Sequence, residues 1–284
     1  MAEVATSATS DQLLVVIDPV ARRTDGESVR IAKDVLSAGA ATKVCLPDDS
    51  EEFARALRRR GSRRPVVIGD DGALIRAVSL LHRHRELADC ALSMVPVGDA
   101  LTLARSLGVP TGAVAAARTV LDGAERRLDL LVDDSDGVVL GALSIPPHRR
   151  REPPPTAPGT PERPWLRTCR FVRDLVAGRP ARVTAVPGPG PSRLRVEVDG
   201  VTLVDLDQPV EGVSVAPGVS GTAEVEVRPV SVGAEAAPLT TAGRTVTVSG
   251  AHFRYRADAM VSGPVRTRTW VVREGAWALT LPSR

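Results

Sequence analysis

The residues with the clearest potential for chemistry form one short turn that is rich in glycine and aspartate. The turn consists of Gly69, Asp70, Asp71, Gly72 and Ala73. It follows an apolar run at residues 65–68 that predicts a strand, and after it apolar residues recur at helical spacing. Glycines let the backbone approach a ligand, and the free N–H groups at a helix start favour an anion. The pattern indicates a phosphate-binding turn, although it is also typical of turns that bind nothing.

A second turn of the same kind follows downstream. Residues 91–95 predict another strand, a turn containing Gly98 comes next, and a short helix then ends at Gly108 and Pro110. Over residues 11–122, four strands alternate with helices, which predicts a parallel sheet with helices on both faces. Such sheets bind ligands at the carboxyl ends of their strands. We therefore expect Asp18, the turn at residues 69–73 and the turn at Gly98 to surround one crevice.

From residue 123 to residue 284 the pattern changes to short strands with alternating polar and apolar residues. This half predicts an antiparallel β-sandwich domain. Within it, residues 146–164 hold eight of the 23 prolines, together with Arg149, Arg150 and Arg151. We expect a loop there, and the alternative is a basic flap that touches anionic membrane headgroups. Residues 1–10 lack the features of a signal peptide and predict a disordered tail.

The composition excludes several classes of function. With 37 Lys and Arg against 34 Asp and Glu, the net charge of +3 argues against a nucleic-acid-binding protein. The three cysteines are widely spaced, which favours a cytoplasmic protein and gives neither a zinc pattern nor a disulfide framework. His82 and His84 would not share a helix face, so no metal site is predicted. No run approaches the roughly 18 apolar residues of a membrane span, which leaves peripheral association with a membrane open.

Taken together, the two turns resemble the catalytic domain family of the diacylglycerol kinases, which includes bacterial lipid kinases and is similar to sphingosine kinases. That family carries a G-G-D-G-T turn and, further on, a P-L-G-T-G-N-D-F-A-R segment. The matching residues are Gly69, Asp71, Gly72 and Leu74 in the first motif, and Pro96, Gly98, Ala104 and Arg105 in the second. The departures are Asp70 and Ala73 in the first motif, and Asp99, Ala100, Leu101 and Thr102 in the second.

The end of the chain extends the resemblance. Residues 253–282 look like the family's last block, which contains D-G-E and a later turn. Asp258 matches the aspartate, whereas Ala259 replaces the glycine and Met260 replaces the glutamate. Gly275 and Ala276 fit the later turn. For Asp258 alone, a solvated turn residue is the alternative interpretation.

A further departure lies after the first predicted strand. The family reads N-P-x-S-G there and uses the segment in nucleotide binding. Pro19 matches the proline, but Asp18 replaces the asparagine. We expect this aspartate to add negative charge near the nucleotide phosphates, which disfavours tight binding of ATP.

The resemblance implies a kinase that uses ATP and Mg²⁺ to phosphorylate the hydroxyl of diacylglycerol or a related lipid. Such a reaction needs a carboxylate near the acceptor and Mg²⁺ to offset charge on the transferred group. Asp71 and Asp258 would then be the catalytic residues. The residues that would shape the nucleotide site are Asp18, Gly69, Asp70, Gly72, Ala73, Gly98, Asp99 and Arg105.

Because all three motif regions are altered, the alternative is an inactive pseudokinase that serves as a nucleotide- or lipid-binding regulatory module. Both interpretations imply a nucleotide, and a lipid or an anionic membrane surface, as partners. A homodimer stays open, and nucleic acid is not expected.

Overall fold

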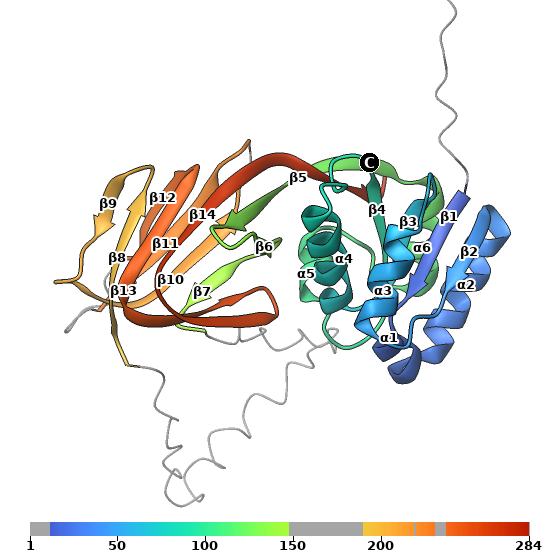
Figure 1. Ribbon diagram of the computed structural model, residues 1–284, viewed down its shortest axis with the longest axis horizontal. Helices are drawn as coiled ribbons and strands as arrows, with labels where there is room; N and C mark the ends of the chain where they lie inside the picture. Colours follow the sequence, from blue (N-terminus) through green and yellow to red (C-terminus); the bar gives the residue numbers. More distant parts are fainter. Residues whose placement is uncertain (1–11, 148–189, 219, 231–236, 284) are drawn as a thin grey trace, which may run out of the picture. The chain divides into compact units, whose positions relative to one another are not determined.

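The computed structural model describes residues 12–147, 190–218, 220–230 and 237–283 (Figure 1). The predicted tail at residues 1–10, most of the segment 146–164 and a predicted strand at residues 182–185 lie outside the described residues. The compact unit considered below consists of residues 1–147 and 191–284. The predicted domain boundary at residue 122 stays a prediction.

The first half of this unit alternates strands and helices, and the described part of the second half consists of strands. The first half contains β1 (Gln12–Ile17), α1 (Pro19–Thr24), α2 (Gly26–Gly39), β2 (Ala41–Cys45), α3 (Ser50–Arg58), β3 (Arg64–Gly69), α4 (Asp71–Arg83), β4 (Ala91–Pro96), α5 (Thr102–Ser106) and α6 (Ala113–Asp122). The second half contains β5 (Ala124–Asp133), β6 (Val138–Val139), β7 (Leu143–Ile145), β8 (Ser192–Val198), β9 (Val201–Val204), β10 (Pro209–Pro217), β11 (Ala223–Pro229), β12 (Leu239–Gly243), β13 (Thr245–Ala257) and β14 (Met260–Leu281). The predicted combination of an α/β part with a strand-rich part is confirmed.

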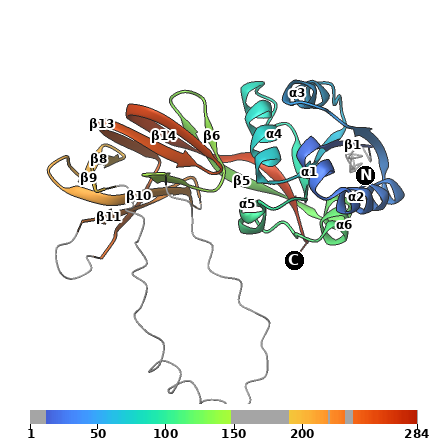
Figure 2. The same cartoon turned by 90° about the horizontal axis from the view of Figure 1, so that it is seen from below.

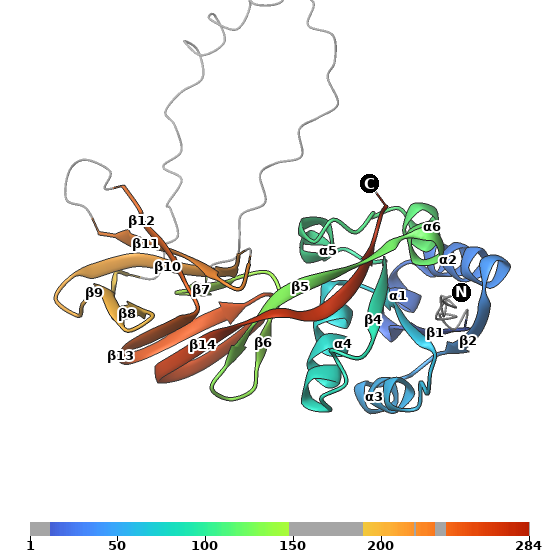
Figure 3. The same cartoon turned by 90° about the horizontal axis from the view of Figure 1, so that it is seen from above.

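Strands β2, β1, β3 and β4 pair in parallel in that order, with helices on both faces (Figures 2 and 3). Alternate residues of β1 enter two different cores. Leu14 and Val16 pack with residues of α3 and α4. Leu13 and Val15 pack with residues of α2 and α6. Because a strand covered on both faces must be apolar at every position, this explains the continuous apolar run in the sequence.

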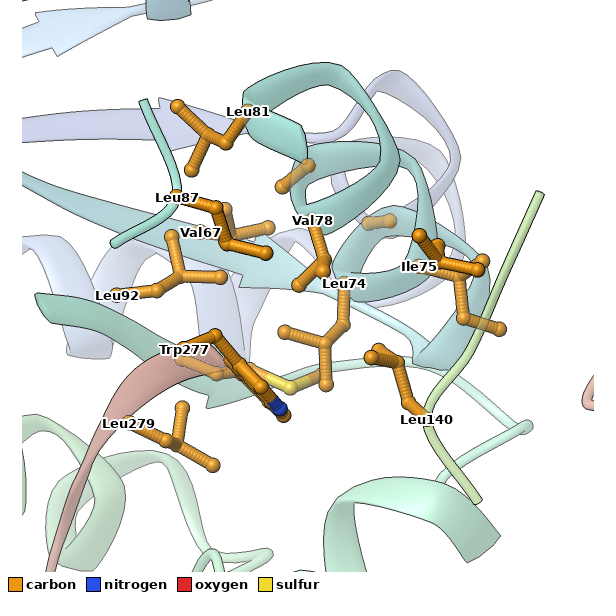
Figure 4. Packing of buried hydrophobic residues seen from close by; sticks show 14 of the residues in the cluster. Val67, Leu74, Ile75, Val78, Leu81, Leu87, Leu92, Leu140, Trp277 and Leu279 are labelled. Atoms are coloured by element: carbon orange, nitrogen blue, oxygen red, sulfur yellow. The ribbon is translucent and has the colours of Figure 1, made fainter. Parts of the chain in front are cut away.

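Strand β14 links the two halves. It pairs antiparallel with β13 and with β5, and near its end it pairs in parallel with β4. Trp277 and Leu279 of β14 lie in one core with Val67, Leu74 and Leu92 (Figure 4). The last residues of the chain therefore complete the core of its first half.

The predicted turn at Gly275 and Ala276 is wrong, because both residues lie inside β14. The register between β14 and β5 shifts there, so the strand bulges instead of turning. Gly275 has a φ of 53°, a left-handed conformation that favours glycine, and its N–H donates to Asp129 Oδ1 at 2.7 Å. The other oxygen of Asp129 accepts from the N–H of Gly221 at 2.8 Å. One carboxylate of β5 thus holds two irregular backbone segments.

Aspartates cap the starts of α3 and α4. Helix α3 begins at Ser50, and its N-cap is Asp49, whose carboxylate accepts from the N–H groups of Glu51 and Glu52. Helix α4 begins at Asp71, and its N-cap is Asp70. In both cases an aspartate satisfies N–H groups that have no partner within the helix. Among the described helices, none has the length and apolar character needed to cross a membrane.

We expect Asp129→Ala to lower the free energy of unfolding by about 2 kcal/mol, because it leaves the N–H groups of Gly275 and Gly221 without their acceptor. Glu125→Ala is the matched control, since Glu125 is an exposed acid on the same strand. Its effect should stay within about 0.5 kcal/mol. Urea denaturation of the two variants measures the difference. Equal stabilities would show that Asp129 does not hold the bulge.

Candidate functional site

Asp70 lies at the turn where the sequence predicts a phosphate to bind. Its Oδ1 accepts a hydrogen bond from the N–H of Ala73 at 3.0 Å, which makes it the N-cap of α4. The N–H groups of the first turn of a helix are the ones that an external anion would contact. One of these N–H groups, that of Ala73, is therefore already bonded to the protein's own carboxylate.

The glycines of the two turns allow close packing around this carboxylate. A Cβ on Gly69 would lie 2.6 Å from Cβ of Ala73 and 3.0 Å from Cβ of Asp18, so β1, β3 and α4 meet too closely for any larger residue. Gly98 has a φ of 122°, and a Cβ on it would lie 3.4 Å from Cβ of Asp70. The ends of β1, β3 and β4 therefore come together at Asp70, as the strand pattern predicts.

Asp18 does not present an unpaired negative charge. It is 1% exposed, and its Oδ1 caps α1 by accepting from the N–H of Val20 at 2.8 Å. Its Oδ2 accepts from Nη1 of Arg76 at 2.6 Å. The Arg76 guanidinium also lies over the ring of Phe53, 5.3 Å from its centroid. The expectation that Asp18 repels phosphates must therefore be corrected, because its charge is neutralised by a residue of α4.

Asp71 is buried and caps a different helix from the one it begins. Its Oδ2 accepts from the N–H of Leu103 at 2.7 Å, and its Oδ1 accepts from the N–H of Ala104 at 2.9 Å. The residue at the N-cap position of α5, Leu101, makes no side-chain cap. Burial raises the pKa of the Asp71 carboxyl, against the effect of these hydrogen bonds, and the nearby charge of Asp70 raises it further. Both oxygens of the Asp71 carboxylate thus stabilise the start of α5.

Asp258 also satisfies backbone N–H groups, from the turn between β13 and β14. Its carboxylate accepts from the N–H groups of Leu140 and Gly141 at 2.8 Å and of Ala142 at 3.0 Å. These hydrogen bonds hold the irregular segment between β6 and β7. They also show that the alternative of a solvated turn residue is wrong. Burial raises the pKa of the Asp258 carboxyl.

The structure brings Asp71 and Asp258 to one place. A Cβ on Gly141 would lie 2.9 Å from both Oδ1 of Asp258 and Cδ1 of Leu103, the residue that Asp71 caps. The charge of Asp71 also contributes to the raised pKa of Asp258. Two carboxyls from distant parts of the sequence thus share one site, but both face backbone N–H groups.

Other predicted residues lie outside this cluster of bonded carboxylates. Asp99 and Arg105 are exposed, and Met260 is 63% exposed. His82 contacts Asp136 rather than His84, at 2.9 Å from its Nε2. Arg76, which pairs with Asp18, matches neither motif and is not among the predicted site residues. Its spacing of four residues from Gly72 was a usable signal, because such residues lie on the same face of a helix.

The carboxylates of this site do not fit a Mg²⁺ site built by the protein. Magnesium prefers oxygen ligands that are free to complete an octahedron. Here Asp70, Asp71 and Asp258 face backbone N–H groups, and Asp18 faces both a backbone N–H group and Arg76. Across the described ranges, no group of three or more His, Cys, Asp and Glu residues could hold a metal ion.

We expect Asp71→Ala to lower the free energy of unfolding by about 2 kcal/mol at neutral pH, because two N–H groups of α5 lose their acceptor. The raised pKa of Asp71 means that the folded state binds its proton more tightly than the unfolded state. Its contribution to stability is therefore full below the unfolded pKa of about 4 and falls as pH rises through the folded pKa.

The stability gap between Asp71→Ala and the wild type should accordingly be wider near pH 4 than at pH 7. Denaturation at both pH values measures it. Asp99→Ala, which removes an exposed aspartate nearby, should show neither effect. A gap that grows toward neutral pH would contradict the direction of the pKa shift.

Residues 12–132 match the family model of the diacylglycerol kinase catalytic domain. A solved structure described as that of a "putative diacylglycerol kinase" from Bacillus anthracis str. Sterne has a TM-score of 0.70 at 14% identity, and the match covers 96% of this chain and 98% of that chain. Another, described as a diacylglycerol kinase from the same organism, has a TM-score of 0.67 at 12% identity over 95% and 97%. At these identities the likeness shows the fold alone.

No curated protein matches the sequence. The resemblance to the diacylglycerol kinase catalytic domain that the glycine turns predict is nevertheless confirmed by the family model over residues 12–132.

Proposed function

We propose that this chain is a member of the lipid kinase family that binds lipid without transferring phosphate. The observation that carries the proposal is the hydrogen bond of 3.0 Å between Oδ1 of Asp70 and the N–H of Ala73. Where the family motif has a glycine, this chain has a side chain that takes the phosphate's place. The pseudokinase alternative from the sequence is thereby favoured over an active kinase.

The electrostatic balance supports this proposal. A phosphate at the start of α4 would lie near the Asp70 carboxylate, and two unit charges about 4 Å apart repel by about 4 kcal/mol at the effective dielectric of a protein surface. The end of a helix stabilises an exposed anion by only about 0.3 to 1 kcal/mol. Repulsion therefore outweighs attraction, and Arg76 offers no compensation because it is paired with Asp18.

The geometry of Asp71 supports it as well. A catalytic carboxylate must reach a proton, a metal ion or the reacting groups. Both oxygens of Asp71 are instead bonded to the start of α5. Freeing these oxygens would break the hydrogen bonds that hold the start of α5. Asp71, which matches the family motif, therefore has a structural role.

A slow kinase is the second candidate, and one observation favours it. Burial raises the pKa of both Asp71 and Asp258, which lie at one site. A general base works best when its pKa approaches the operating pH, and raised values move a carboxyl in that direction. In this candidate Asp258 would accept the proton of the lipid hydroxyl.

We expect ATP with Mg²⁺ at millimolar concentration to leave the Tm of the wild type unchanged and to raise that of Asp70→Gly by about 3 °C, because glycine removes the negative charge from the helix start. Glycine replaces an N-cap at little cost, so this variant should fold. Asp49→Gly is the matched control, since it removes the N-cap of α3 away from the site. It should gain no response to ATP. A wild-type protein stabilised by ATP would contradict the closed phosphate position.

We expect the wild type to transfer no labelled phosphate from ATP to diacylglycerol in mixed vesicles, because it lacks a place for the γ-phosphate. Labelled lipid formed in proportion to enzyme would favour the slow kinase. In that event Asp258→Asn should lower the rate by about 10² to 10⁴, the usual loss for an acid or base partner. Thermal melting of that variant separates loss of chemistry from loss of structure.

A further inference from the structure

The turn between β13 and β14 presents apolar side chains to solvent. Met260 is 63% exposed and Val261 is 44% exposed, and both lie at the start of β14. Most large apolar side chains of the described residues are buried, and these two are adjacent in the sequence. Met260 also stands where the family's last motif has a glutamate, so an acidic position has become apolar.

Three arginines lie on the outer face of the same hairpin. Arg256 is paired with Val261 across the ladder, and partners in a ladder share a face. Arg254 lies two residues earlier on the same strand, so it shares that face. Arg266 follows Val265, the partner of the buried Phe253, and therefore points outward too. Met260 is the ladder partner of Ala257, so it does not share the face of Arg256 and Val261 and lies beside that face at the tip of the hairpin. We call Arg254, Arg256, Met260, Val261 and Arg266, which come from this face and the tip, the hairpin patch.

The positive charge of the hairpin patch is not balanced by the protein. No described residue forms an ion pair with Arg254 or Arg266, and Arg256 donates to the neutral carbonyl of Ala259 at 3.2 Å. Asp258 is the one acidic residue between His252 and Thr267, and its carboxylate is bonded to three backbone N–H groups. A ligand of opposite charge would relieve this imbalance.

We propose that the hairpin patch docks the protein on an anionic lipid membrane. This inference rests on the proposed function, in which the partner is a lipid. Apolar side chains at a tip enter the headgroup region, while arginines remain beside the anionic headgroups. Each arginine near such a surface strengthens binding roughly fivefold. A protein partner would need an interface of about 1,000 Å² or more, which a narrow hairpin with two exposed apolar residues does not supply.

Asp258 fixes the conformation of the hairpin turn before it contacts a membrane. Its three hydrogen bonds join the turn to residues 140–142, and its own N–H donates to the carbonyl of Ala142 at 2.9 Å. The turn therefore need not become ordered when it binds. Holding a contact surface in its bound conformation beforehand reduces the entropy lost on association.

The test is co-sedimentation of the full chain with vesicles of phosphatidylcholine alone or mixed with phosphatidylglycerol. We expect binding to the mixed vesicles that weakens as salt is added, and little binding to phosphatidylcholine alone. Met260→Glu should weaken binding at least tenfold, and the double variant Arg254→Glu, Arg266→Glu should abolish it. Val201→Glu is the matched control, because Val201 is 71% exposed beside the turn of another hairpin.

Equal binding of wild type and Met260→Glu, or an equal loss in Val201→Glu, would overturn the docking proposal. Binding that ignores the anionic lipid would overturn it as well. Unchanged thermal melting of the variants shows that they fold. The outcome is separate from that of the ATP experiment: a docking protein that also binds ATP would contradict only the closed phosphate position, and a protein that binds neither would contradict only the docking.

Discussion

The site is organised by the need of exposed backbone N–H groups for acceptors. Helix starts and irregular loops leave such groups without backbone partners, and carboxylates are the strongest acceptors that a side chain can offer. Asp18, Asp70 and Asp71 satisfy the starts of α1, α4 and α5, and Asp258 satisfies the segment between β6 and β7. An acceptor used in this way holds the framework in place.

This constraint explains why the fold needs the residues of the two turns whatever the chemistry of the site. The glycines at positions 69 and 98 are required by packing around Asp70, whether or not a phosphate binds. Asp71 is required by α5, whose own N-cap position holds a leucine. A motif composed of such residues therefore indicates the fold more directly than it indicates the activity. At position 70, the aspartate carboxylate supplies the acceptor for the start of α4.

The helices and strands could be predicted where the sequence pattern that indicates them is local. The apolar runs of β1, β3 and β4 and the amphipathic pattern of α4 were all visible in the sequence, and the carboxyl ends of these strands do meet at Asp70. Contacts between distant residues were not visible. The pairing of Asp18 with Arg76 spans 58 positions and that of Asp71 with Leu103 spans 32. Such contacts depend on side-chain directions that only the folded backbone sets. The continuity of β14 through Gly275 was missed for the same reason, because Asp129 of β5 stabilises the bulge.

The path of β14 has a consequence for the order of folding during synthesis. Trp277, Leu279 and Leu281 belong to the core that β3 and α4 build, and β14 covers the edge of β4. Residues 12–132 leave the ribosome long before these residues do, with an apolar surface and a strand edge still open. Covering this surface and this edge requires pairing between residues as far apart in the sequence as Leu92 and Leu279, and such contacts are slow to form. Residues 12–132 are therefore synthesised first, but their core is complete only after β14 has been synthesised and has paired with β4.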